Sequence, residues 1–122
     1  MALQGKVISG LGEGSFWVKK IANVFKEKTG MNLFYGTLNI ELDKPYKLGE
    51  DIIIVHKKEY GGAEELYFEP CKMNGYDAYI IRTAKSESGE GGHPLTILEI
   101  MSDVNLRDKF GLKDGDNVLI SV

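Results

Sequence analysis

The sequence predicts a small, mostly antiparallel β-barrel with helices at its edge. About six or seven short segments have the alternation or the β-branched content of strands, hairpins and turns join most of them, and only two segments have helical spacing. Because strands and helices do not alternate regularly, a doubly wound parallel sheet is not expected. The 122 residues contain no internal repeat and no long linker, so residues 1–122 are expected to form one domain.

The beginning of the chain predicts a strand followed by a helix. Residues 5–9 suit a short strand, and the glycine-rich stretch 10–14 follows it. Ser15 is a candidate N-cap for a helix that runs to about Thr29 and stops at Gly30. Four apolar residues spaced i, i+4, i+7 and i+8 share one face of this helix: Trp17, Ile21, Val24 and Phe25. Three lysines lie mostly on the side expected to face solvent: Lys19, Lys26 and Lys28.

The middle of the chain predicts four strands. Residues 37–42 alternate strictly between apolar and polar, which is typical of a half-buried strand, and residues 51–56 are apolar and β-branched at their centre. Residues 66–73 and 76–83 flank Asn74-Gly75, a strong signal for a two-residue hairpin turn.

The end of the chain predicts, in order, a loop, a strand, a short helix and a final strand: residues 85–92, 95–101, 104–110 and 117–122. Asp103 is a candidate N-cap for the short helix, and Gly111 stops it. Asp114-Gly115 turns the chain into the final strand.

Composition excludes several classes of function. A net charge of −3 argues against broad nucleic-acid binding, which depends on a basic surface. One cysteine allows no intrachain disulfide, and with two histidines a zinc site is not expected. The longest apolar run, 52–55, is too short to span a membrane, and the N-terminus lacks a basic segment followed by an apolar one, so we expect a cytoplasmic protein without a signal peptide.

The stretch GLGEG, residues 10–14, lies between the first strand and the first helix. Glycines there expose backbone N–H groups at a helix N-terminus, which is a plausible phosphate cradle. The alternative is a turn that merely needs positive φ, and Glu13 would repel phosphate unless it points outward or meets a metal. The pattern is neither the dinucleotide fingerprint nor a P-loop.

Three further positions are candidates for chemistry. Thr37 and Asn39 share one face of a strand, so two hard, neutral oxygens lie side by side, as suits Mg²⁺ when phosphates supply the charge; the alternative is a solvent-facing polar edge. Glu99 shares a strand face with apolar residues, so it is either a partnered carboxylate that could act as a general base, or simply hydrated.

Other candidates carry weaker signals. His93 follows the glycine-rich loop, and a lone loop histidine is more often structural or solvated than catalytic. Arg107 could contact a phosphate or a base, or pair with Asp103 four residues earlier. Three tyrosines could stack on a planar ligand, although core packing is commoner: Tyr35, Tyr76 and Tyr79.

Four segments, taken in order, carry a family resemblance: SGLGEGSFW, GTLNIEL, HPLTILEI and LRDKFGLKDGDNVLI. From Gly5 to the end, the chain resembles the archaeal-type, CTP-dependent riboflavin kinases. The resemblance implies a cradle-loop β-barrel with two short flanking helices. It also implies transfer of the terminal phosphate of CTP to the ribityl 5′-hydroxyl of riboflavin, giving FMN and CDP.

The resemblance also implies site residues. Two segments would contact the nucleotide, namely Ser9, Gly10, Leu11, Gly12, Glu13 and Gly14, and then Val104, Asn105, Leu106 and Arg107. Thr37 and Asn39 would bind Mg²⁺. Glu99 would lie at the ribityl end of the flavin, where it orients the 5′-hydroxyl and could accept its proton. The family usually has a flavin-site threonine two residues before the histidine, but this sequence has Gly91, so Ser86 or Ser88 could replace that contact.

Two alternatives to the kinase stay open at this point. One is a catalytically silent flavin or nucleotide sensor on the same barrel, against which the presence of both Thr37 and Asn39 speaks. The other is a DNA-binding regulator of the cradle-loop type, against which the acidic balance speaks. The expected partners are CTP, CDP, riboflavin and FMN, with neither nucleic acid nor membrane, and the expected state is a monomer.

Overall fold

A computed structural model describes residues 1–10, 14–90 and 94–122, and for residues 14–17 the backbone alone. Within these residues the chain forms seven strands and four helices. In chain order they are β1 (Ala2–Ile8), α1 (Gly14–Thr29), β2 (Leu38–Leu42), β3 (Ile53–Val55), α2 (Lys57–Tyr60), β4 (Leu66–Met73), β5 (Tyr76–Thr83), α3 (Ala84–Glu87), β6 (Ile97–Met101), α4 (Leu106–Phe110) and β7 (Asn117–Ser121). No helix in the described ranges is long and apolar enough to cross a membrane.

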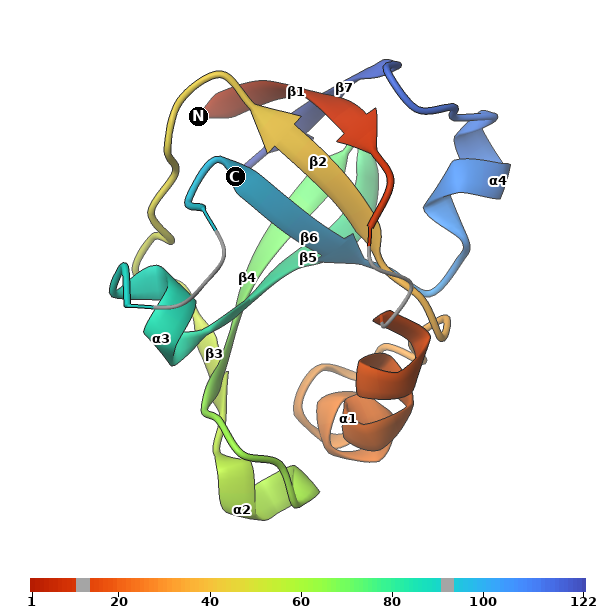
Figure 1. The fold of residues 1–122 in the computed structure, drawn as a ribbon. Helices are drawn as coiled ribbons and strands as arrows, with labels where there is room; N and C mark the ends of the chain where they lie inside the picture. Colours follow the sequence, from red (N-terminus) through yellow and green to blue (C-terminus); the bar gives the residue numbers. More distant parts are fainter. Residues whose placement is uncertain (11–13, 91–93) are drawn as a thin grey trace.

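Six of the strands close into an antiparallel barrel, which confirms the predicted fold class (Figure 1). The order around the barrel is β4-β5-β6-β2-β1-β7, and pairing of β7 with β4 closes the ring. β3 pairs with the other half of β4 and lies outside the ring. The longest ladder is the β4–β5 hairpin, whose turn has positive φ at both Asn74 (49°) and Gly75 (84°), as a type I′ turn requires.

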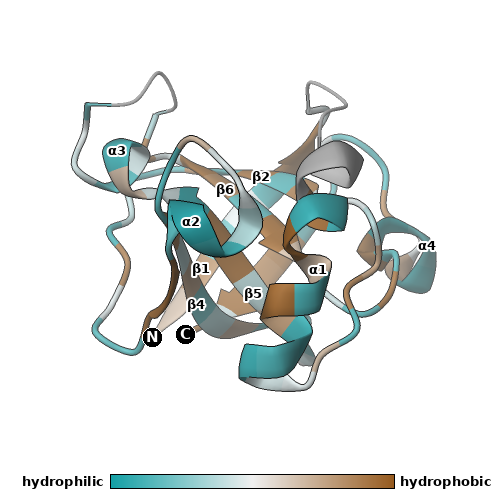
Figure 2. Ribbon diagram, turned by 90° about the horizontal axis from the view of Figure 1, so that it is seen from below, coloured by the Kyte–Doolittle hydropathy of each residue, from teal (hydrophilic) through white to brown (hydrophobic). Residues whose placement is uncertain are grey.

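Apolar side chains form two cores, one on each face of the sheet. Inside the barrel, inward residues from all six strands pack together, among them Val7, Ile40, Ile80, Leu98, Ile100, Val118 and Ile120. On the outer face, α1 covers β4, β5 and the end of β6 with a second cluster that includes Val18, Ile21, Phe25, Phe68, Ile81 and Met101. Figure 2 shows brown and teal segments alternating along α1, as expected of a helix with one buried face.

Phe25 is the centre of the outer core. Its ring centroid lies 4.8 Å from that of Phe68 and 4.8 Å from that of Tyr79, the latter in an edge-on arrangement. Ile21 and Phe25 are fully buried, as their predicted shared face requires. The helix begins at Gly14, so Ser15 is a helical residue rather than the predicted N-cap. Gly30, with φ of 81°, ends the helix as predicted.

One end of the barrel is sealed by a buried carboxylate. Glu69 on β4 is only 6% exposed and points inward. It accepts hydrogen bonds from the Tyr46 hydroxyl (2.5 Å) and from the backbone N–H of Gly49 (2.7 Å), so both of its oxygens are used. Burial, followed by the hydrogen bond to Glu69, raises the pKa of Tyr46 above its usual value near 10.

A buried arginine completes this end. Arg82 on β5 is also 6% exposed, and its guanidinium donates to the carbonyls of Tyr46, Leu95 (2.9 Å) and Ile97 (3.5 Å) and to Glu87 Oε1 (2.9 Å). The arginine thus ties the loop before β3, the start of β6 and α3 to one strand. We call Tyr46, Glu69, Arg82 and Glu87 the sealed end.

The predicted loop over residues 85–92 is partly wrong, because its first residues form α3. Thr83 caps this helical turn by accepting a hydrogen bond from the backbone N–H of Ser86 (3.1 Å). Glu87 is held by Arg82 and accepts from the backbone N–H of Leu48 (3.0 Å). Long-range contacts therefore order a segment whose composition is typical of a loop.

The cap predicted for α4 is also wrong. Asn105, not Asp103, is the N-cap, and its side chain accepts from the backbone N–H of Asp108 (3.2 Å). Asp103 instead accepts a hydrogen bond from the Tyr76 hydroxyl (2.7 Å). Gly111 ends the helix with φ of 62°, as predicted.

Candidate functional site

The segments singled out in the sequence meet at the end of the barrel opposite the sealed end. Figure 1 shows the last residues of β1, the start of β2 and the end of β6 together beside the start of α1. The strand register accounts for this meeting: Ile8 pairs with Asn39, and Asn39 pairs with Glu99. The predicted metal-binding strand is therefore flanked by the end of β1, which leads to Gly10, on one side and by Glu99 on the other.

Three oxygen-bearing side chains gather on the outer face of β2 and β6. The Thr37 hydroxyl donates a hydrogen bond to Glu99 Oε1 (2.9 Å), and Asn39 lies opposite Glu99 in the ladder. All three side chains are half-buried, whereas Leu38 and Ile40 between them face the barrel interior. We call Thr37, Asn39 and Glu99 the oxygen cluster; the prediction that Thr37 and Asn39 share a face opposite the apolar residues is confirmed.

The start of the glycine-rich stretch packs directly against this cluster. A Cβ atom at Gly10 would lie 1.9 Å from Asn39 Nδ2, so any other residue at position 10 would require the Asn39 side chain to move. Glycine at position 10 thus lets the backbone approach the Asn39 amide in its present position. Gly14 begins α1, whereas Leu11, Gly12 and Glu13 lie outside the described residues.

A pocket of about 220 Å³ opens next to the oxygen cluster. Its walls come from the stretch before β2, from the end of β6 and from the start of α4: Phe34, Gly36, Thr37, Leu38, Ile100, Met101, Ser102, Val104, Asn105, Leu106 and Arg107. All four residues of the second predicted nucleotide segment line this pocket, together with one predicted metal ligand. Two stretches far apart in the sequence are thus brought to one cavity.

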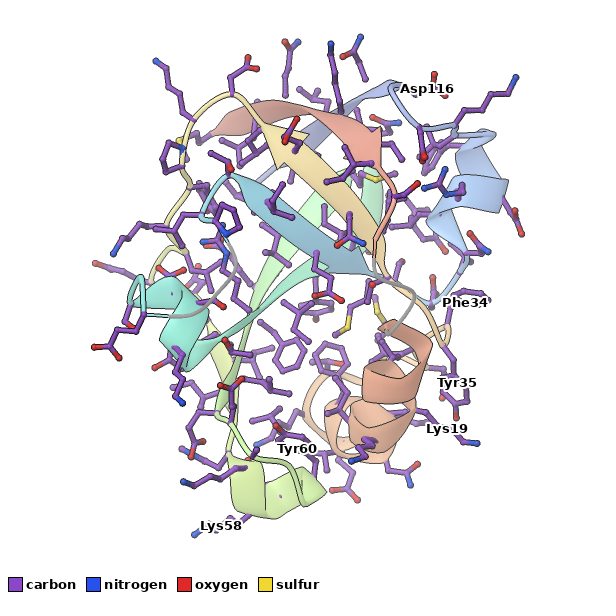
Figure 3. The ribbon with its side chains drawn as sticks, in the orientation of Figure 1. Lys19, Phe34, Tyr35, Lys58, Tyr60 and Asp116 are labelled. Carbon is purple, nitrogen blue, oxygen red and sulfur yellow. The ribbon has the colours of Figure 1, made fainter. Side chains whose placement is uncertain are left out.

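Phe34 lines this pocket but was not predicted from the sequence as a site residue. Its side chain is 40% exposed, and Figure 3 places it with Tyr35 on the stretch between α1 and β2, on the side of α4. A Cβ atom at Gly36 would lie 2.9 Å from the Phe34 ring, so the glycine before Thr37 leaves room for that ring. An exposed aromatic residue without periodic spacing has no distinctive signal in the sequence.

Arg107 and Ser9 share one partner. Arg107 Nη2 lies 3.0 Å from Asp114 Oδ1, and the Ser9 hydroxyl donates to Asp114 Oδ2. The pairing of Arg107 with Asp103 is thus wrong, since the arginine turns instead toward the loop before β7. These two contacts, the hydrogen bond from Ser9 first and that from Arg107 second, hold the pKa of Asp114 below its usual range.

The predicted flavin side is described only in part. Gly91 and His93 lie outside the described residues. Ser86 is buried and bonds with Thr83, whereas Ser88 is exposed and donates to the carbonyl of Lys85 (2.8 Å). Two of the three tyrosines already have partners, because Tyr79 packs against Phe25 and the Tyr76 hydroxyl donates to Asp103. Tyr35 is exposed, so of the three it remains the candidate for stacking on a planar ligand.

The donor atoms of the oxygen cluster fit a hard divalent cation. A hydroxyl, an amide oxygen and a carboxylate are the ligand types that Mg²⁺ prefers, and Mg²⁺ is commonly held by few protein ligands together with substrate phosphates. In the described part of the chain, the Asn39 side chain makes no hydrogen bond and Glu99 accepts only the one from Thr37. The cluster therefore keeps oxygen lone pairs available for a ligand.

Comparisons with known proteins give a consistent result. Residues 7–122 match the family model CTP-dep_RFKase, described as Domain of unknown function DUF120. A riboflavin kinase of Pyrobaculum aerophilum is 35% identical over 98% of this chain and 60% of its own length. A riboflavin kinase of Methanocella arvoryzae is 30% identical over 98% of this chain and 56% of its own length.

A third relative matches along more of its length. The riboflavin kinase of Staphylothermus marinus is 34% identical over 98% of this chain and 90% of its own length. Against the relatives from Methanocella, Pyrobaculum and Archaeoglobus, by contrast, this chain spans between 54% and 60% of their length.

Proposed function

Because this chain belongs to the family of CTP-dependent riboflavin kinases, we propose that it transfers the terminal phosphate of CTP to the 5′-hydroxyl of riboflavin, giving FMN and CDP. One observation carries the proposal at the level of the site. The oxygen cluster lies beside a pocket that is lined by all of Val104, Asn105, Leu106 and Arg107. Transfer needs this combination of a nucleotide pocket, cation ligands and a carboxylate near the reacting oxygen.

The pocket side of the site is assigned to the nucleotide. We assign the phosphates to the boundary between Gly10 and the oxygen cluster, where backbone can approach closely. Arg107, with N–H donors beyond the one facing Asp114, can contact the nucleotide from the pocket wall. The remaining residues of the glycine-rich stretch, Leu11, Gly12 and Glu13, keep their predicted nucleotide contacts as part of this proposal.

Thr37 and Asn39 would hold Mg²⁺ through the hydroxyl and amide oxygens. When bound, the ion supplies charge neutralisation at the phosphate oxygens. Thr37 can use its oxygen lone pairs in this way because its proton is already donated to Glu99. The Thr37 hydroxyl can therefore bind the cation and donate to Glu99 at the same time.

Glu99 is assigned to the reacting hydroxyl. In the proposed step, the 5′-oxygen of riboflavin forms a bond to the terminal phosphorus, the bond from that phosphorus to the CDP oxygen breaks, and the hydroxyl proton passes to the Glu99 carboxylate. Because phosphoryl transfer has a loose transition state, Glu99 acts first by orienting the hydroxyl. The hydrogen bond from Thr37 holds one carboxylate oxygen, so the other oxygen would contact the substrate hydroxyl.

A chromatographic assay tests the proposal. Purified protein is mixed with riboflavin, Mg²⁺ and either CTP or ATP, and the flavins are separated. We expect FMN with CTP, much less with ATP, and none after chelation of the metal. Absence of FMN with any nucleoside triphosphate, from protein that is folded by circular dichroism, contradicts the proposal and favours a silent sensor. Size-exclusion chromatography of the same sample tests the expected monomer.

A further inference from the structure

Asp114 links two segments that lie far apart in the sequence. It is in the turn that precedes β7, 105 positions from Ser9. One carboxylate oxygen accepts from Ser9, the last residue before Gly10, and the other lies 3.0 Å from the Arg107 guanidinium in the wall of the pocket. We propose that Asp114 is a positioning residue that holds Ser9 and Arg107 in the arrangement that binds CTP. This inference rests on the proposed function.

The turn that carries Asp114 is itself anchored. The backbone N–H of Gly115 donates to the carbonyl of Val7 (2.7 Å), and the N–H of Val7 donates to the carbonyl of Asp116 (2.9 Å). Asp116 also accepts from the backbone N–H of Lys113 (2.8 Å). Asp114 is therefore held at a fixed place beside the end of β1, which is the condition for positioning another residue.

The chemistry of the two partners decides what Asp114 can do. The hydroxyl of Ser9 has one proton, and it is donated to Asp114, so this hydroxyl has none left for a phosphate oxygen. The hydrogen bond from Ser9 to Asp114 then contributes to the site by fixing the position of the backbone that leads into Gly10. Arg107 has five N–H donors, so the ion pair with Asp114 orients the guanidinium and leaves donors for the nucleotide.

A competing inference is that Asp114 occupies the place of a phosphate and weakens nucleotide binding. The geometry argues against it. Arg107 lines the pocket, whereas Asp114 is not among the lining residues and its side chain is 54% exposed. The carboxylate thus stands behind the arginine and not in the path of the ligand.

The test compares Asp114→Ala and Asp114→Asn with the wild-type protein. We expect Asp114→Ala to raise the KM for CTP about five- to tenfold, with kcat and the KM for riboflavin changed less than about twofold, because two exposed charge-assisted contacts are lost. Asp114→Asn should fall between, since its amide oxygen still accepts from Ser9 but no longer pairs with the charge of Arg107. Asp77→Ala is the matched control, because Asp77 forms an exposed ion pair with Lys72 (3.3 Å) on the β4–β5 hairpin.

A double-mutant cycle separates positioning from general destabilisation. If Asp114 acts through Arg107 and Ser9, then Asp114→Ala should have little further effect on the KM for CTP in the Arg107→Ala, Ser9→Ala background. Additive effects, an equal rise in both KM values, or a fall in the KM for CTP would each overturn the inference. A wild-type protein that makes no FMN contradicts the proposed function; a wild-type protein that makes FMN, with Asp114→Ala behaving identically, contradicts this inference alone.

Discussion

Glu69 and Glu99 are two carboxylates in the same barrel, and each accepts a hydrogen bond from a hydroxyl. Glu69 bonds to Tyr46 and to the N–H of Gly49, so both oxygens are occupied, and it is buried. Glu99 is half-buried and accepts only from Thr37 among the described residues. A buried carboxylate whose two oxygens are both hydrogen-bonded within the protein stabilises the structure, whereas a half-buried one with an oxygen left over is available to a ligand.

The same difference separates the two ends of the barrel. At the sealed end, Arg82 donates to four acceptors in three separate stretches of chain. At the other end, Thr37 lines a pocket, and next to it Asn39 and Glu99 each have an oxygen to which no other described residue donates a hydrogen bond. We therefore expect substitutions at the sealed end to change stability, and those at the oxygen cluster to change activity.

The largest effect is expected at Arg82. Replacing it by methionine keeps the length of the side chain but leaves Glu87 and three carbonyls without their donor. We expect a loss of about 3–5 kcal/mol in the free energy of unfolding, measured by urea denaturation. Lys72→Met, at an exposed ion pair, is the control and should change it by less than about 0.5 kcal/mol. Equal stability of the two variants would remove the distinction between the ends.

The sharpest comparison makes one chemical change at both carboxylates. Glu69→Gln leaves one buried donor at Tyr46 or Gly49 without an acceptor, so it should lower the free energy of unfolding by about 1–3 kcal/mol. Glu99→Gln should change stability by less than about 0.5 kcal/mol, because its amide oxygen still accepts from Thr37.

The activities of the same pair should show the opposite order. Glu99→Gln should lower kcat about 10²-fold or more while keeping riboflavin binding, measured by flavin fluorescence. Loss of flavin binding with unchanged turnover would contradict the function assigned to Glu99. Glu69→Gln, assayed at a temperature where it is folded, should retain turnover.

A smaller effect is expected at Thr37. Thr37→Val has nearly the same shape but no hydroxyl, so it should raise the Mg²⁺ concentration needed for half-maximal FMN formation by about tenfold. Thr37→Ser keeps the hydroxyl and should resemble the wild-type protein. If valine and serine behave alike, Thr37 is not a cation ligand.

The smallest effect concerns the thiol near the sealed end. Burial first, and then the charge of Glu69, raises the pKa of Cys71 to about 12. A protonated, buried thiol reacts slowly, so we expect iodoacetamide to leave Cys71 unmodified at pH 8 in the folded protein and to label it in urea, measured by mass spectrometry. Because the pKa of this thiol is higher in the folded protein, its contribution to the free energy of unfolding is fully present below the unfolded pKa near 9. That contribution is lost as the pH rises through about 12. Rapid labelling of folded protein would contradict the burial of this end.

Local patterns made much of the fold predictable. Asn74-Gly75 identified the hairpin, because few residue pairs adopt two positive φ angles. Strict alternation identified the buried face of β2, on which Leu38 and Ile40 lie, and helical spacing identified the face of α1 that buries Ile21 and Phe25. Each of these elements is determined by neighbours within a few positions.

Long-range polar contacts were not predictable in this way. Arg107 pairs with Asp114 rather than with the nearer Asp103, and Arg82 orders α3 through Glu87. The inward position of Glu69 could have been read from period-two spacing with Cys71 and Met73, but a single sequence does not say which strand ends a barrel buries. The oxygen cluster was predictable as separate residues, whereas the register that joins Asn39 to Glu99 was not.

The closure of the barrel has a consequence for how the protein fluctuates. The β4–β7 seam has two register pairs, Lys72 with Ser121 and Met73 with Ile120, against eight pairs in the β4–β5 hairpin. Two hydrogen bonds between Asn74 and Leu119 reinforce it (2.8 and 2.9 Å). Local opening should begin at this short ladder, where amide protons exchange with solvent soonest. Because β2 and β6 lie across the ring from the β4–β7 seam, the barrel can open locally at the seam while the oxygen cluster stays assembled.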